Sequence, residues 1–416
     1  MITSSVILLI SYCLIALEKI PRVTIAIIAA AITLALGVVP SEHAFHHIDF
    51  GVIFLLVSMM IIVHISARSG VFKWTAIELL KLTKGKPKLV LAAMALFTAL
   101  ASAFLDNVTT VILVLPITFV IAKEFNISPI PFLITEIMAS NIGGTATLIG
   151  DPPNIIIGSA AGLGFMDFVK ELTPVIAVIF IVCILLLMYL FRKELVSTTE
   201  KMEHVANLDN SKTIKDKPLM IRSLIVLSLV ILGFIFHGMI HIEAYTIALL
   251  GAGVLLLFET PRQIIHDVEW TTIFFFIGLF IIIGGLVETG VIKLLANELI
   301  SFTKGDVKLT SMIIIWASGI LSAIFDNIPY TIAMTPLIKE LQGTMNLEPL
   351  WWSLSLGACL GGNATIIGAA ANVIVCEAAH SHGHKISFLS FMKYGVLITF
   401  VSLAISSGYI YLRFFL

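Results

Sequence analysis

The chain of 416 residues is 59% hydrophobic and only 12% charged, and its mean hydropathy is +1.07. Soluble domains carry about 25% charged residues, so this composition excludes a soluble protein and indicates an integral membrane protein. The formal net charge of −1 excludes a broad basic surface for nucleic acid. Apolar runs of about 17 to 20 residues, without the alternation of barrel strands, predict an all-α polytopic fold.

The apolar runs follow the same order in both halves of the chain. In the first half we expect spans at 1–17, 23–39 and 51–67, paired arms at 89–105 and 107–123, a broken span at 129–163, and a last span at 172–191. In the second half we expect spans at 220–237, 243–258 and 271–287, arms at 309–325 and 327–343, a broken span at 350–379, and a last span at 393–411. The sequence thus predicts about ten transmembrane helices with two arm pairs and two broken helices.

Each pair of arms could form a re-entrant hairpin or two full spans. We favour re-entrant helical hairpins, because each tip is an Asp-Asn pair flanked by apolar residues and not a hydrated loop.

Motifs recur between the halves at an offset of about 220 residues, which predicts two structural repeats. "FLDNVTTVILVLPI" aligns with "IFDNIPYTIAMTPLI", so Asp106 matches Asp326 and Asn107 matches Asn327. "GGTATLIGDPPNIII" aligns with "GGNATIIGAAANVIV", and "ARSGVF" with "VETGVI". We therefore divide the chain into a first repeat at 1–192, a cytoplasmic linker at 193–219 and a second repeat at 220–416.

The loop charges predict that the second repeat is inverted. The loop from Arg68 to Lys88 is strongly basic, whereas the matching loop from Glu288 to Lys308 holds equal numbers of acids and lysines. Basic loops mark the cytoplasmic side, so the two loops face opposite sides and both termini lie outside the plasma membrane. Inverted repeats are an architecture of secondary transporters, whose sites lie near the bilayer midplane.

The stretch "SNIGGTATLIGDPPNIIIGS" interrupts the first broken span with glycines and prolines, which do not sustain a regular helix. Unwound backbone at membrane depth is tolerated only where protein buries it or water lines it. The exposed half-helix ends can hold an anion or a cation, so the motif predicts one wall of an ion site. The alternative is a kinked span whose polar side chains satisfy the loosened backbone.

The Asp-Asn pairs form a second motif, because a carboxylate in lipid costs at least ~2.5 kcal/mol and marks an ion path or proton relay. Helix capping is the alternative reading of these pairs, and capping can coexist with ion binding. Asp151 has no acidic counterpart, since Ala369 stands at its place in the second repeat. This asymmetry is a reason to assign Asp151 a role of its own, such as proton carriage.

The predicted ion-binding residues come from both repeats. They are Asp106, Asn107, Thr109, Thr110, Asn141, Gly143, Thr145, Thr147, Asp151, Asn154, Asp326, Asn327, Thr331, Asn363, Thr365 and Asn372. Asp106, Asp151 and Asp326 are the proton-carrier candidates. The one metal that we expect is sodium, at the two Asp-Asn tips. We expect no cofactor other than sodium or protons as coupling ions.

These motifs resemble the ion transporter superfamily, which includes arsenite permeases, sodium/proton antiporters, the P protein and divalent-anion symporters. "NIGGTATLIGDPPN" is most similar to the arsenite-permease and P-protein branch. The resemblance implies inverted repeats, re-entrant hairpins, broken helices, a homodimer and an elevator-type motion. The symporters' neutral Ser-Asn-Thr tips and "GTPPN" are replaced here by Asp106-Asn107, Asp326-Asn327 and "GDPPN".

The added acids disfavour a dicarboxylate substrate, because they would repel it unless cations neutralise them. The sequence therefore predicts proton- or sodium-coupled transport of a small inorganic ion, with arsenite or antimonite efflux first, sodium/proton antiport second and sodium-coupled anion transport third. A channel, a membrane subunit for a separate ATPase and an intramembrane enzyme remain alternatives. We expect no enzyme, because HExxH, GxSxG and Walker motifs do not occur in the sequence.

Overall fold

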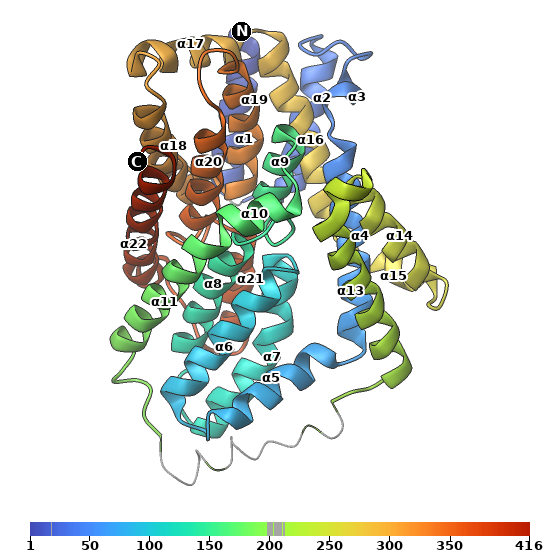
Figure 1. Ribbon diagram of the computed structural model, residues 1–416, viewed down its shortest axis with the longest axis vertical. Helices are drawn as coiled ribbons and strands as arrows, with labels where there is room; N and C mark the ends of the chain where they lie inside the picture. The colour runs from blue at the N-terminus through green and yellow to red at the C-terminus, as the bar shows by residue number, and fades with distance from the viewer. Residues whose placement is uncertain (18, 198–202, 204–209, 211–212) are drawn as a thin grey trace.

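The computed structural model describes residues 1–17, 19–197, 203, 210 and 213–416. The middle of the linker predicted at 193–219 lies outside these residues. The described chain is helical apart from turns and one isolated bridge between Gln342 and Met345. The prediction of an all-α fold is confirmed, and Figure 1 shows helices from both halves packed against one another.

The main helices of the first half follow the predicted order. They are α1 (Ile2–Ala16), α2 (Arg22–Ala35), α4 (Phe50–Arg68), α5 (Val71–Leu82), α6 (Pro87–Ser102), α7 (Asn107–Phe125), α8 (Ile130–Gly144), α9 (Pro152–Ala161) and α11 (Thr173–Leu190). The second half has α13 (Lys217–Ile240), α14 (Ala244–Leu256), α16 (Trp270–Glu288), α17 (Val291–Thr303), α18 (Val307–Phe325), α19 (Asn327–Glu340), α20 (Glu348–Gly361), α21 (Ala370–Ser381) and α22 (Phe388–Phe414).

Five further helices lie between the expected spans. They are the short helices α3 (Ala44–His47), α10 (Phe165–Glu171) and α15 (Pro261–His266), together with α5 and α17. All five lie in the segments between the predicted spans, which contain no long apolar run. They link the spans and do not change the predicted order of the spans themselves.

A glycine turn produces α5 and α17 and explains why "ARSGVF" and "VETGVI" recur. Gly70 and Gly290 precede these helices with φ values of +88° and +75°. Only glycine adopts this left-handed region without steric cost, so the chain can turn sharply out of α4 and α16. The recurring motif therefore specifies a bend at the same point of each repeat.

The helices pack in two groups. We call α1, α2, α4, α13, α14 and α16 the span group, because α2 packs on α16, α14 on α4 and α13 on both α4 and α14. We call α6–α9 and α18–α21 the hairpin group, because α6 packs along α8, α18 along α20, α19 on α9 and α21 on α7. The two groups meet where α4 contacts α9 and α16 contacts α19.

The two halves are inverted relative to each other. Figure 1 shows α5, α6 and α7 at one end of the molecule, and α17, α18 and α19 at the opposite end. The turns that join α6 to α7 and α18 to α19 nevertheless meet inside the protein, because Asn107 and Asn327 both bond to Asp151. The paired arms are therefore hairpins that enter from opposite ends.

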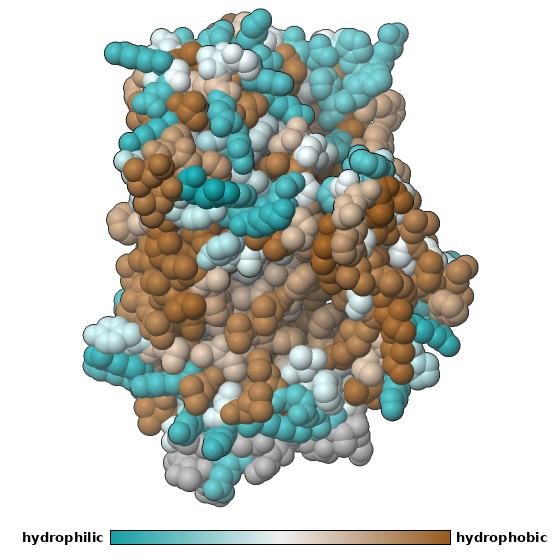
Figure 2. Space-filling view, viewed as in Figure 1, coloured by the Kyte–Doolittle hydropathy of each residue, from teal (hydrophilic) through white to brown (hydrophobic). Residues whose placement is uncertain are grey.

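Lipid-facing surface is concentrated on a few helices. Seven described helices are long and apolar enough to cross a membrane, namely α4, α7, α11, α13, α16, α18 and α22. In the most apolar stretch of α4 and of α16, 67% of the residues are buried inside the protein, against 28% in that of α13. α4 and α16 are therefore interior helices, and α13 faces lipid. Figure 2 shows a hydrophobic band across the middle of one face, with hydrophilic residues at both ends.

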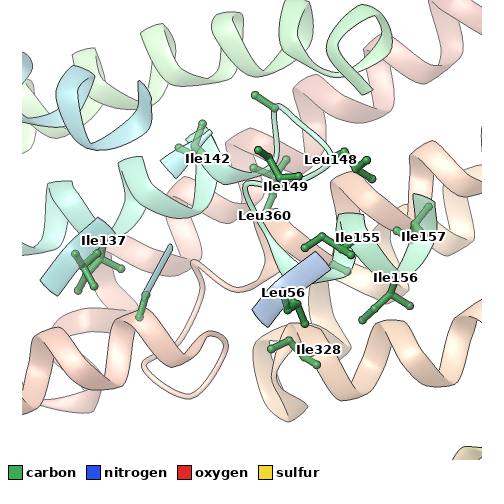
Figure 3. Packing of buried hydrophobic residues seen from close by; sticks show 14 of the residues in the cluster. Leu56, Ile137, Ile142, Leu148, Ile149, Ile155, Ile156, Ile157, Ile328 and Leu360 are labelled. Atoms are coloured by element: carbon green, nitrogen blue, oxygen red, sulfur yellow. The ribbon is translucent and has the colours of Figure 1, made fainter. Parts of the chain in front are cut away.

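Small residues bring the hairpins against the broken helices. A Cβ added at Gly143 of α8 would lie 2.2 Å from the carbonyl oxygen of Ala99 in α6, and one at Gly361 of α20 would lie 2.5 Å from that of Gly319 in α18. Figure 3 shows apolar side chains, such as Ile155 and Leu360, filling the space around the break between α8 and α9. Both repeats thus use the same close helix contact to position their break.

We expect Gly143→Ala to destabilise the protein, because the methyl group overlaps backbone that cannot move without separating α6 from α8. Overpacking of this kind costs about 1–3 kcal/mol. The melting temperature of purified protein in detergent measures the effect. Gly408→Ala in α22 is the matched control, since nothing lies within 4 Å of its added Cβ. An equal melting temperature for the two variants would contradict the packing argument.

Candidate ion-binding site

The site is built on two unwound segments. α8 ends at Gly144 and α9 begins at Pro152, while α20 ends at Gly361 and α21 begins at Ala370, so both broken spans are confirmed. Asp151 and Ala369 precede the second half-helices with nearly the same extended backbone. The two repeats therefore share a backbone shape at the break but differ in the side chain that it presents.

Asp151 lies at the centre, with no solvent exposure. Its Oδ1 accepts hydrogen bonds from Nδ2 of Asn107 at 3.4 Å and from Nδ2 of Asn327 at 3.2 Å, and its Oδ2 lies 3.3 Å from the same Asn327 nitrogen. The carboxylate does not cap α9. An asymmetric acid is thus held by a symmetric pair of amides, one from each hairpin tip.

Asn141 connects the two repeats behind Asp151. Its Oδ1 accepts from Nδ2 of Asn107 at 3.2 Å, and its Nδ2 donates to Oδ1 of Asn363 at 2.9 Å and of Asn372 at 3.0 Å. All of these side chains are buried. Nδ2 of Asn363 has no hydrogen-bond partner among the described residues. The other bonds lie in a dry interior, where hydrogen bonds are strong, so they tie the first tip to both breaks.

The tip aspartates cap the second arms of the hairpins, as the capping alternative predicted. Oδ1 of Asp106 accepts from the backbone nitrogen of Thr109 at 2.9 Å, and Oδ1 of Asp326 accepts from that of Ile328 at 3.1 Å. Oδ2 of Asp326 also forms an ion pair with Arg22, the first residue of α2. Both tip carboxylates therefore already have protein partners.

Asp326 differs from Asp106 in its backbone. Its φ of +75° with ψ of 144° lies in a region that residues other than glycine rarely adopt, whereas Asp106 has φ of −64°. Such a conformation costs about 1–3 kcal/mol and persists only where neighbouring groups hold it. The Arg22 ion pair and the cap to Ile328 are two such constraints.

Several predicted ligands brace the unwound backbone. Nδ2 of Asn154 donates to the carbonyls of Thr145 and Thr147 at 3.1 and 2.8 Å, and Oδ1 of Asn154 accepts from Ser355 at 2.6 Å. Asn372 repeats the pattern in the second half, donating to Gly362 and Thr365. These side chains satisfy backbone groups that the break leaves open, as the alternative reading of the motif expects.

A cavity of about 270 Å³ lies beside Asp151, between the hairpin and span groups. Asp106, Asn107, Asp151, Asp326 and Asn327 are the predicted residues that line it. The span group contributes Arg22 and Glu269, the residue that precedes α16. Four acids thus face one arginine, and this excess of negative charge favours a cation over an anion.

The other predicted residues lie outside the cavity. Thr109, Thr145, Thr147, Thr331 and Thr365 direct their hydroxyls to Asp106 or to backbone carbonyls. Gly143 packs on α6, and Oγ1 of Thr110 has no hydrogen-bond partner among the described residues. Their role as ion ligands stays a prediction.

Three charged residues were missed by the sequence reasoning. Arg22 and Glu269 each lie just before a predicted span, at 23–39 and at 271–287. Glu136 of α8 is 2% exposed and accepts a hydrogen bond from Thr118 at 2.6 Å. The usable signal for Glu269 was the repeat itself, since it matches Asp49 at the offset of 220 residues.

Comparison with known proteins agrees with a transporter architecture. The crystal structure of the YdaH transporter from Alcanivorax borkumensis superposes with a TM-score of 0.57 at 13% identity, covering 89% of this chain and 88% of that one. At this identity the likeness shows the fold alone. The fold, the two breaks and the buried polar centre define a multi-span membrane protein with a polar site between its two halves.

The family follows from sequence. The family model described as Citrate transporter matches residues 12–357, so the chain belongs to this family, within the ion transporter superfamily that the motifs resemble. An uncharacterized transporter of Mycobacterium tuberculosis is 42% identical, covering 97% of this chain and 96% of its own length. The P protein of Mus musculus is 31% identical over 96% of this chain and 58% of its own length.

The bracing by Asn154 predicts a large effect of its removal. Asn154→Ala leaves two backbone carbonyls and Ser355 without their partner, and each buried unsatisfied group costs about 1–3 kcal/mol. We expect a clear loss of thermal stability of the purified protein, whereas Asn297→Ala on the exposed side of α17 should leave it unchanged. A wild-type melting temperature for Asn154→Ala would show that the break does not need this brace.

Proposed function

We propose that this protein is a secondary active transporter that exchanges sodium for protons across the plasma membrane, with Asp151 as the shared cation and proton site. The observation that carries the proposal is the buried Asp151 carboxylate in a cavity where Asp106, Glu269 and Asp326 add negative charge. Among the described residues that line this cavity, Arg22 is the one that carries a permanent positive charge. One carboxylate that binds either a proton or sodium couples the two ions by competition. The same charge excess opposes a citrate-like substrate, despite the family's description.

Efflux of arsenite or antimonite is the second candidate, although the sequence ranked it first. A cavity of about 270 Å³ is several times the volume of one water molecule, about 30 Å³, and so admits more than a bare cation. The amides of Asn107 and Asn327 beside it could also bond to the hydroxyl groups of a neutral metalloid acid. We rank sodium/proton exchange first because the excess of acids attracts a cation, whereas it does not stabilise a bound neutral solute.

An elevator-type motion is the mechanism that we propose. The hairpin group holds Asp151 and both tips, while the span group contributes Arg22 and Glu269 across the cavity. A cavity between two separately packed groups supports a movement of the hairpin group that carries the site along. A homodimer and a separate ATPase subunit remain predictions from the resemblance.

Proteoliposomes test the proposal. Internal pH is followed while sodium, lithium, arsenite, antimonite and citrate are offered in turn. We expect a proton signal with sodium or lithium, and we expect Asp151→Asn to reduce it to the level of empty liposomes. Asp267→Asn, at an exposed acid after α15, is the matched control and should retain the signal.

Each other outcome has a definite meaning. A signal with arsenite or antimonite alone would replace sodium/proton exchange by the second candidate. A signal with citrate would contradict the charge argument. If sodium evoked the same proton signal in Asp151→Asn as in the wild type, Asp151 would not be the shared site.

A further inference from the structure

The ion pair between Arg22 and Asp326 joins the two helix groups. Arg22 begins α2 of the span group, whereas Asp326 forms the tip of the α18–α19 hairpin. The Asp326 side chain is 2% exposed and that of Arg22 is 21% exposed, so the pair lies at the buried edge of the cavity. A movement of the hairpin group past the span group would have to separate these two charges.

The repeat places no second arginine on the opposite side. α14 is the counterpart of α2. Glu243 directly precedes α14 as Pro21 precedes α2, so Ala244 stands at the position of Arg22. A shared "TIA" sequence, at 24–26 and 246–248, supports this alignment. Among the described residues that line the two cavities, a permanent positive charge therefore stands in the first cavity only.

A second cavity marks that opposite side. It has a volume of about 620 Å³ and is lined by Asp49, Glu243, Ala244 and Tyr245, the counterparts of Glu269, Pro21, Arg22 and Val23 in the first cavity. The end of α9 lines it, where Ser159 donates a hydrogen bond to Asp49. The two cavities therefore lie at equivalent places in the two repeats. Arg22 lines the first cavity, and Ala244 lines the second.

We propose that Arg22 is a tethered counter-ion that neutralises Asp326 in the arrangement seen here and competes there with the coupling cation. In the opposite arrangement Arg22 stays behind with the span group, and Asp326 must carry sodium or a proton in its place. A buried carboxylate without a partner is costly, so the hairpin group moves away from Arg22 only when a cation has bound. This inference rests on the proposed cation coupling. It assigns to Arg22 the release of that cation on one side of the membrane.

Other ionisable groups around Asp326 set the background for this competition. Asp151, Asp106 and Glu269 line the same cavity and add negative charge. From α1, Tyr12 approaches the same tip, and its hydroxyl donates to the carbonyl of Pro329 at 2.7 Å. None of these groups supplies a positive charge, so removal of Arg22 leaves the cavity more attractive to cations.

The test measures cation affinity and not only activity. Sodium binding to purified protein is titrated at several pH values for wild type, Arg22→Gln, Arg22→Lys and Asp326→Asn. We expect Arg22→Gln to lower the half-saturating sodium concentration, measured at a pH where protons do not compete, by about tenfold or more. Because the lost charge favours protons as well, the pH below which sodium binding weakens should rise. Arg22→Lys keeps the charge and should stay near the wild type.

Two controls separate this role from a structural one. Arg262→Gln removes an exposed arginine of α15 and should change nothing. The double variant Arg22→Gln/Asp326→Asn should bind no more tightly than Asp326→Asn, because the competition requires both partners. Melting temperatures identify any variant that has lost its fold. If Arg22→Gln is such a variant, Arg22→Lys is compared with Arg22→Met to isolate the effect of the charge.

The outcomes distinguish the two proposals. If wild type responds to sodium and Arg22→Gln binds it with unchanged affinity and pH dependence, the counter-ion role is wrong and cation coupling stands. Equal tightening in the Asp326→Asn background would also contradict the role. If no variant responds to sodium or protons, both this role and the proposed function fail.

Discussion

The structure depends on one buried carboxylate held between two hairpins of opposite direction. Asp151 has no exposed surface, and its partners Asn107 and Asn327 come from tips that enter the protein from opposite ends. A charge in this setting is tolerated only if it is well paired or neutralised. The amides supply hydrogen bonds but no charge, so a proton or a cation is the natural counterpart of Asp151.

The rest of the hairpin group serves this arrangement. Close packing at Gly143 and Gly361 brings each break against the hairpin of its own repeat, and Asn154 and Asn372 hold the unwound backbone open. The span group then covers the tips with charged residues at the starts of α2 and α16. The repeats share the scaffold, whereas two residues without an equivalent in the other repeat, Arg22 and Asp151, make the two sides chemically different.

Local signals predicted most of the fold. Glycine and proline located both breaks, and the recurrence of "DN" and "GG" revealed the repeats, because helix breaking and capping depend on neighbouring residues. The helices α5 and α17 were missed, since they begin only at a glycine turn and are not long apolar runs. The Arg22–Asp326 pair was also missed, because 304 residues separate the partners and only the tertiary fold brings them together.

The most direct measurement of the central claim is proton release on cation binding. Purified protein in weakly buffered solution is given sodium while the pH is recorded, for the wild type and for Asp151→Asn. Competition at a single carboxylate predicts acidification in the wild type that saturates with sodium and is lost in the variant. Equal release by both proteins, or sodium binding by the wild type without proton release, would contradict the account.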